Sequence, residues 1–159
     1  MEITELASDE VVTVYLDESI LEVAETLREA QVGSAVVLDT KDDVLGVVTD
    51  RDLVVYGQQF VDSLATTTVN DILSMGVVSV GPDEEVLELT ELMREEGVRR
   101  VPVVEDGDIL GIVTLDDVVV GLAEELESPE LENLAAVIEA ASPQERGDPE
   151  PEGEAPVDR

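Results

Sequence analysis

The sequence predicts an α/β fold made of two tandem repeats, followed by one extra helix and a tail. Three observations lead to this prediction. Residues 11–55 and 77–120 are identical at about 20 of some 44 aligned positions, which chance does not produce. Within each copy, short β-branched runs alternate with segments whose apolar residues recur every three or four positions, as in strands alternating with amphipathic helices. A further amphipathic helical period follows the second copy.

Each copy is expected to run strand, helix, strand, strand, helix. The first helix opens at Ser19, because Glu22 three positions later completes a capping box. Its counterpart in the second copy ends before Gly97, a residue suited to the position just past a helix. Thr49 and Thr114 open the second helix of each copy. The predicted strands are 11–14, 35–38 and 44–48 in the first copy, and 101–104 and 109–113 in the second.

The chain divides into four segments by these patterns. Residues 1–60 form the first repeat, and 61–127 form a connector and the second repeat. Ser128 and Pro129 then start an extra amphipathic helix over 128–141, since Pro favours the first helical position. Residues 142–159 are rich in Pro, Gly and acid and are expected to be a disordered tail. The predicted apolar face of the extra helix is Leu131, Leu134, Ala135, Val137, Ile138 and Ala141.

Composition excludes several functions. The 159 residues contain no Cys, His or Trp, so thiolate nucleophiles, His bases and the usual zinc sites are absent. A net charge of −32 repels nucleic acid, and 2% aromatic residues leave little surface on which bases would stack. Neither a signal peptide nor an apolar run of the ~20 residues that span a membrane is found. We therefore expect a soluble, cytoplasmic protein that is not an enzyme and binds no metal.

The same charge predicts adaptation to a very salty cytoplasm, such as that of a halophilic archaeon. Asp and Glu number 40 against 8 Lys and Arg, yet 43% of the residues are hydrophobic, which is enough for a folded core. At about 1 M salt the Debye length is only ~3 Å, so self-repulsion on this scale is tolerable. The alternative is an ordinary acidic protein whose charge is increased by its tail.

The most distinctive motif is Gly-h-h-Thr-x-x-Asp, where h is apolar, at residues 46–52 and again at 111–117. The simplest interpretation is a helix cap, because Ser/Thr-x-x-Asp before a helix is a capping box. The same helix start is also suited to an anion, since its backbone N–H groups and its dipole favour negative charge. Both interpretations remain open at this point.

These repeats resemble a pair of CBS (cystathionine β-synthase) domains. The resemblance covers residues ~1–127 and rests on the repeated order of elements, the two Gly-h-h-Thr-x-x-Asp motifs and the Val101-Pro102-Val103-Val104 run. It implies two repeats packed about a pseudo-twofold axis, with two clefts that take adenosyl ligands. Thr49 and Thr114 would contact phosphate, and Asp52 and Asp117 the ribose. The first cleft would be completed by Val98, Arg99, Arg100, Val101 and Pro102, and the second by Val32, Gly33, Ser34 and Ala35.

The placement of the few cations supports an anion in the first cleft. Three of the eight basic residues, Arg51, Arg99 and Arg100, would converge there. A guanidinium group can donate two parallel hydrogen bonds to one phosphate, in bidentate geometry. The alternative is that they form salt bridges with the abundant carboxylates. The second cleft has Asp116 in the place of Arg51, so we expect the first cleft to be the tighter site for phosphorylated nucleotides.

The favoured function is therefore a regulatory module. It would sense AMP, ADP or ATP (S-adenosylmethionine is the weaker candidate), with or without Mg²⁺, and would use no catalytic cofactor. The resemblance further implies a homodimer, and an effector protein of unknown identity would receive the signal; neither nucleic acid nor membrane is an expected partner. The main alternative is a ligand-free domain for protein interaction or dimerisation.

Overall fold

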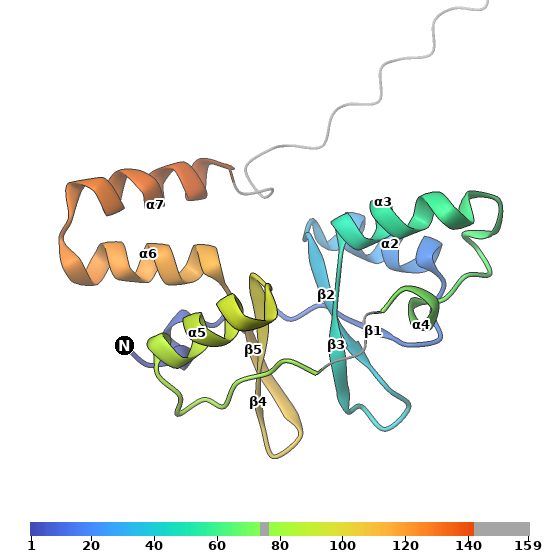
Figure 1. Cartoon of the computed structure of the whole chain (residues 1–159), viewed down its shortest axis with the longest axis horizontal. Coiled ribbons are helices and arrows are strands. Elements are labelled where there is room, and N and C mark those ends of the chain that lie inside the picture. Colours follow the sequence, from blue (N-terminus) through green and yellow to red (C-terminus); the bar gives the residue numbers. More distant parts are fainter. Residues whose placement is uncertain (74–76, 142–159) are drawn as a thin grey trace, which may run out of the picture.

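The computed structural model describes residues 1–73 and 77–141, which form two α/β halves followed by one further helix (Figure 1). Along the sequence, each repeat begins with a short helix: α1 (Ile3–Leu6) in the first repeat and α4 (Val69–Ile72) in the second. The rest of the first repeat is β1 (Thr13–Tyr15), α2 (Ile20–Ala30), β2 (Ser34–Leu38), β3 (Val44–Thr49), α3 (Asp50–Gly57) and a 3₁₀ turn, η1 (Gln58–Ser63). The second repeat continues with α5 (Val86–Glu96), β4 (Arg100–Glu105), β5 (Asp108–Thr114) and α6 (Leu115–Leu126), and α7 (Pro129–Ala141) follows it. The predicted fold class is confirmed.

Two small sheets form the centre of the halves. In the first, β1 pairs in parallel with β2, and β2 pairs antiparallel with β3. In the second, β4 and β5 form an antiparallel pair, and the expected first strand is reduced to one bridge between Val80 and Val103. The first strand of the chain also begins two residues later than predicted, at Thr13.

The helix boundaries follow the predicted caps. The Glu22 backbone N–H donates to Ser19 Oγ at 3.2 Å, and the Ser19 N–H donates to Glu22 Oε2 at 2.8 Å. These hydrogen bonds stabilise the ionised carboxylate and lower the pKa of Glu22. Helix α5 ends at Gly97, whose φ of 67° lies in the left-handed region that glycine adopts without strain.

Each half has its own apolar core, and the two cores exchange their short helices. Ile3 of α1 is fully buried in the core of the second half, together with Leu89 and Val113. Val69 of α4 is fully buried in the core of the first half. The start of the chain therefore completes the second repeat, and the connector completes the first.

Backbone hydrogen bonds fix this exchange. Ser8, just after α1, forms an antiparallel bridge with Ile112 of β5, with N–H···O distances of 2.9 Å and 3.0 Å. Helix α1 also packs against α6, and Leu6 lies where a side chain at Gly121 would otherwise project. Strands β3 and β4 lie next to each other between the two cores. The two halves thus form one interlocked unit.

The last helix is shorter by one residue than predicted, and its apolar face is only partly covered. Helix α7 packs along α6, with Ala135 buried between them (Figure 1). Leu134 and Val137, on the predicted apolar face, are 45% and 57% exposed. The reason is that α7 contacts a single neighbouring helix rather than a two-sided core. The predicted tail lies outside the described residues.

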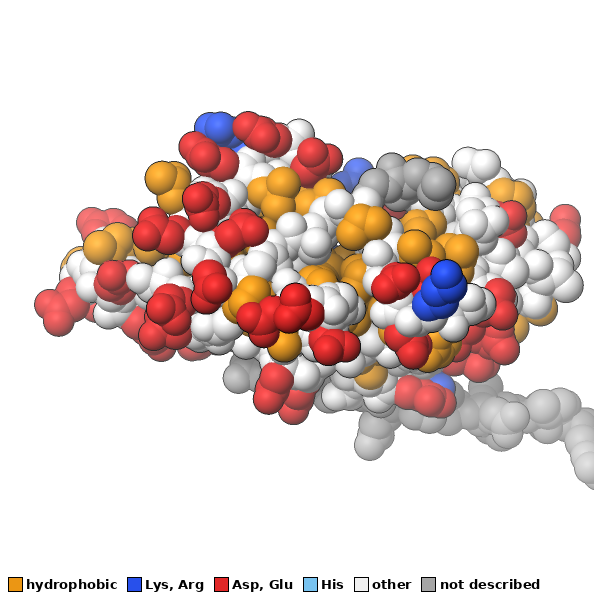
Figure 2. All heavy atoms as spheres, turned by 90° about the horizontal axis from the view of Figure 1, so that it is seen from below, with side chains coloured by type: hydrophobic (Ala, Val, Ile, Leu, Met, Phe, Trp, Pro, Cys, Tyr) orange, Lys and Arg blue, Asp and Glu red, His pale blue; other side chains and the backbone are white. Residues whose placement is uncertain are grey.

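Across the described parts of the chain, no helix combines the length and the apolar character that crossing a membrane requires. Figure 2 shows one face of the molecule, on which acidic side chains surround patches of apolar ones and basic side chains are few.

Candidate ligand-binding site

A cleft of about 610 Å³ lies where β3 ends, α3 begins and the segment between α5 and β4 approaches from the other repeat. It therefore brings together two segments that are about fifty residues apart in sequence. Six of the eight residues predicted for the first cleft line it, namely Thr49, Arg51, Asp52, Val98, Arg99 and Arg100.

The start of α3 forms one wall of this cleft. Strand β3 delivers Thr49 directly after the buried Val48, and Thr49 caps the helix. The Asp52 N–H donates to Thr49 Oγ1 at 3.2 Å, and the Thr49 N–H donates to Asp52 Oδ2 at 2.9 Å. The cap is therefore real, but it leaves the Thr49 hydroxyl proton and Asp52 Oδ1 without a hydrogen bond to any described residue. Both atoms can serve a ligand at the positive end of the helix.

The three arginines of the cleft are not paired with carboxylates. Within residues 1–73 and 77–141, the one ion pair shorter than 4.0 Å joins Arg28 and Glu29, at 3.7 Å. Arg51 and Arg99 are exposed, and Arg100 is half-buried. The salt-bridge interpretation of these arginines therefore gains no support from the described residues. Their guanidinium groups keep their donors for a ligand.

The cleft is close to neutral in an otherwise strongly acidic chain. Its three arginines face three carboxylates, those of Asp50, Asp52 and Glu96. Against a net charge of −32 for the whole chain, this balance makes the cleft the place where an anion meets least repulsion.

Two residues that the resemblance placed in the first cleft do not line it. Val101 and Pro102 are buried in strand β4, where they pair with Val113 and Ile112 of β5. Val101 belongs to the second apolar core. The strand alternates its side chains between two buried faces, so the wall of the cleft ends at Arg100.

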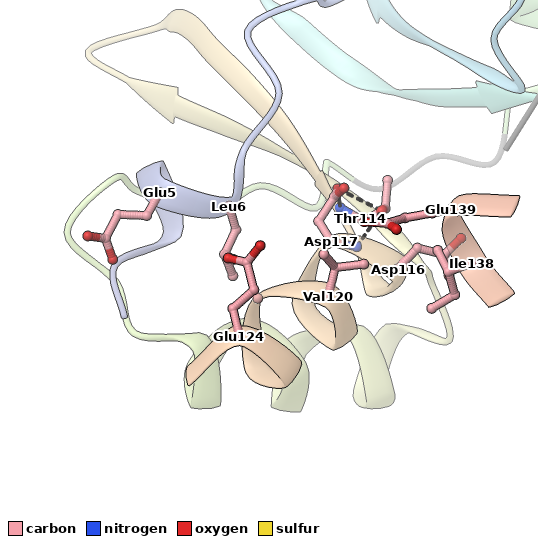
Figure 3. Close-up of a pocket in the computed structure, with 10 residues that line it drawn as sticks. Glu5, Leu6, Thr114, Asp116, Asp117, Val120, Glu124, Ile138 and Glu139 are labelled. Atoms are coloured by element: carbon pink, nitrogen blue, oxygen red, sulfur yellow. Dashed lines mark hydrogen bonds between the residues drawn. The ribbon is translucent and has the colours of Figure 1, made fainter. Parts of the chain in front are cut away.

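Thr114 and Asp117 lie in a separate, smaller cavity of about 410 Å³ (Figure 3). The residues expected to complete it, Val32, Gly33, Ser34 and Ala35, are not among its lining. Ala35 is buried in the first core, and the Gly33 carbonyl accepts a hydrogen bond from the Asp50 N–H at 3.0 Å. Gly33 also lies close to the Arg100 guanidinium of the other repeat, on the side of the first cleft.

The second cavity is closed instead by two helices that sequence reasoning did not assign to it. Glu5 and Leu6 come from α1, and Ile138 and Glu139 come from α7. The exchange of α1 and the docking of α7 depend on contacts between distant segments, and no local motif marks them. Residues 3–6 and 69–72 share the same order of apolar and polar positions, and this was the one hint in the sequence that α1 belongs to a repeat.

The second cavity is acidic throughout. Five carboxylates line it and no arginine or lysine does. They do not form a metal site: among the described residues, no group of three or more acidic side chains has the arrangement that could hold a metal ion. The lining carboxylates are Glu5, Asp116, Asp117, Glu124 and Glu139.

Two interlocked α/β repeats with a ligand-sized cleft between them define a tandem-repeat binding module. The chain belongs to the CBS domain family, whose model matches residues 3–58 and 69–124. Pairs of CBS domains act generally as regulatory, ligand-binding modules, and proteins that consist of such a pair are typically not catalytic. An uncharacterised protein of Methanopyrus kandleri is 37% identical over 115 residues, which is 72% of this chain and 59% of that protein.

Solved structures show the same fold. A CBS-domain protein from Agrobacterium tumefaciens is 34% identical, with a TM-score of 0.66 over 74% of this chain and 90% of that one. A CBS domain pair solved in complex with methylthioadenosine and S-adenosyl-L-methionine has a TM-score of 0.69 at 23% identity, over 79% of this chain and 98% of that one. The relatives come from archaea and from bacteria and give no support to an origin in a halophilic archaeon.

Proposed function

We propose that this CBS pair is a regulatory module that binds a phosphorylated adenosyl ligand (AMP, ADP or ATP) in the cleft between α3 and residues 96–100. The observation that carries the proposal is the convergence of three arginines on the capped start of a helix, in a chain that has only eight basic residues. None of the three forms an ion pair with another described residue. Ligand binding would change the contact between the two repeats and so signal to a partner or to a second copy. S-adenosylmethionine is a weaker candidate for this cleft, since its sulfonium centre gains nothing from the arginines.

The geometry of the cleft supports a nucleotide in particular. Phosphate oxygens would accept from the Thr49 hydroxyl and from the guanidinium groups, near the positive end of the α3 dipole. The free Oδ1 of Asp52 would accept from a ribose hydroxyl. The apolar side chains of Ile72, Leu73 and Val78 offer a surface for the adenine ring. A Mg²⁺ ion bridging the phosphates is compatible with the proposal but is not needed for it.

The first prediction concerns the arginines. Arg51→Ala/Arg100→Ala is expected to weaken binding of AMP and ATP by about tenfold per arginine, because a hydrogen bond to a charged group contributes about 1.5–3 kcal/mol and part of that is lost to solvent here. Isothermal titration calorimetry at high salt measures the affinity. Arg28→Ala/Arg94→Ala removes the same charge from helices α2 and α5 outside the cleft and is the matched control. Equal affinity for the cleft variant and the parent would contradict the proposal.

The second candidate function, a ligand-free interaction domain, is favoured by one observation. Val54 and Val55 on α3 are 74% and 50% exposed, and such neighbouring apolar side chains suit a protein partner or a homodimer. Differential scanning fluorimetry with millimolar AMP, ADP and ATP separates the candidates. A sensor gains thermal stability by mass action, whereas a ligand-free domain keeps its melting temperature.

We further propose that the chain works in a salt-rich solution. Its 40 acidic residues repel one another, and about 1 M KCl reduces the range of that repulsion to ~3 Å. The free energy of unfolding, measured by urea denaturation, is therefore expected to rise steeply between about 0.1 and 1 M KCl and to level off above that. A parallel series in guanidinium chloride at the same ionic strengths is the comparison, because this salt screens charge and also denatures. A stability that is flat with KCl would show that the charge is tolerated without salt.

A further inference from the structure

The two clefts of this pair are related by the internal repeat, yet their outer walls come from different parts of the chain. In the first cleft the wall opposite the helix start is the segment 96–100 of the other repeat, with Arg99 and Arg100. The second cleft has no such segment in its lining and is bordered instead by α7, which contributes Ile138 and Glu139. Figure 3 shows these two side chains reaching from α7 toward Thr114 and the first turn of α6.

Helix α7 reaches this position by covering a face that stays open in the first repeat. Val120 on α6 lies on the side of α7 and is half-buried. Its counterpart one repeat earlier is Val55 on α3, which is 50% exposed. The buried Ala135 secures the contact between α6 and α7. Coverage by α7 is therefore a property of the second repeat alone.

Charge in the second cleft opposes a phosphorylated ligand, and α7 adds to it. Four carboxylates already line the cleft from α1 and α6, and Glu139 of α7 supplies a fifth, whereas the first cleft has three arginines in its lining. A phosphate there would meet five carboxylates and no basic side chain of the described lining.

The threonine hydroxyls that cap the two helices form different hydrogen bonds in the two clefts. The Thr114 hydroxyl donates to Asp117 Oδ2 at 2.6 Å, so its proton is used within the cap. In the first cleft the hydroxyl of Thr49 only accepts, from the Asp52 N–H. The threonine that would bind a phosphate oxygen is therefore occupied in the second cleft.

We propose that α7 forms the closing wall of the second cleft and that Glu139 is a specificity-determining residue which excludes phosphorylated ligands from it, so that the chain holds one such ligand rather than two. This inference rests on the proposed function of the first cleft. It assigns to the extra helix a role in the selectivity of a symmetric pair, in addition to its packing on α6.

The test counts AMP bound per chain by isothermal titration calorimetry on the full chain, at high salt and in EDTA so that no divalent cation bridges the carboxylates. The parent is expected to bind one AMP. Asp116→Arg/Glu139→Arg places one guanidinium group at the repeat counterpart of Arg51 and a second on α7 in the lining of the same cleft, and is expected to bind two. Asp116→Arg/Glu132→Arg is the matched control, with the same change of charge on the same helices, but Glu132 does not line the cleft; it is expected to bind one.

A second measurement keeps the inference testable should the double variant fail to fold. In the parent background, Thr49→Ala is expected to weaken AMP binding by about tenfold, while Thr114→Ala changes it by less than about twofold. Each variant removes the side-chain cap of one helix, a loss that a folded domain tolerates. Two AMP molecules on the parent, one on Asp116→Arg/Glu139→Arg, or equal effects of the two threonine variants would overturn the inference. A parent that binds no nucleotide at all would instead overturn the proposed function.

Discussion

Ile3→Ala is expected to lower the free energy of unfolding by about 2–5 kcal/mol, the usual loss for a large-to-small change in a core. The effect is notable because Ile3 is the third residue of the chain, in a helix of only four residues, and such terminal segments commonly tolerate truncation. Ile3 is nevertheless fully buried in the core of the second half. Urea denaturation in about 1 M KCl, followed by circular dichroism, measures the loss.

The exchange of short helices supplies a counterpart and a control for this prediction. Val69→Ala removes the equivalent residue from the core of the first half and is expected to lose about 1.5–3 kcal/mol. Leu87→Ala removes an apolar side chain that is 66% exposed on α5 and is expected to change stability by less than about 0.5 kcal/mol. If Ile3→Ala behaved like Leu87→Ala, the start of the chain would not form part of the second core.

Gly111→Ala is expected to be the most damaging addition of a single methyl group, lowering stability by about 1–3 kcal/mol or more. A Cβ atom at Gly111 would lie 2.8 Å from the Ser8 carbonyl oxygen and 3.1 Å from Ala7 Cβ. Ser8 cannot move aside without breaking its two backbone hydrogen bonds to Ile112. The methyl group would therefore force the chain start away from β5 and loosen the contact that buries Ile3.

Gly81→Ala is the control for this change. Its Cβ would meet only the Glu84 carboxylate, at 3.6 Å, which is an ordinary contact with a flexible side chain. Its effect on the urea midpoint is expected to be small. Hydrogen exchange of the Ile112 amide reports the mechanism, since that N–H donates to the Ser8 carbonyl. Faster exchange in Gly111→Ala together with unchanged exchange in Gly81→Ala is the expected result; a Gly111→Ala variant as stable as the parent contradicts it.

Much of the fold was predictable because its signals are local. The cap at Ser19 and the capping boxes at Thr49 and Thr114 lie where the sequence predicted them, since a cap needs only a residue and its neighbour three positions later. Gly97 ends α5 for the same kind of reason. The weak first strand of the second repeat was not predictable, because pairing depends on the partner strand as much as on the sequence of the strand itself.

The parts of the candidate site that follow from the internal repeat were predictable from the sequence, and the other parts were not. The convergence of Arg51 with Arg99 and Arg100 follows from placing two copies face to face, and the structure brings these residues to one cleft. The same reasoning assigned residues 32–35 to the second cleft, which they do not line. The symmetry of the repeat does not include α7, whose Ile138 and Glu139 are part of the lining of this cleft.

By itself, the sequence determined that this chain is a tandem α/β pair, where its helices begin, and that its few cations gather at one of two equivalent positions. Only the tertiary structure decided that α1 and α4 exchange cores and that α7 covers α6 and walls off the second cleft. The physical reason is that an amphipathic helix specifies which of its faces is buried, but not against which partner. Hydrophobic burial has no direction, so the choice of partner depends on the shape and the contacts of the whole chain.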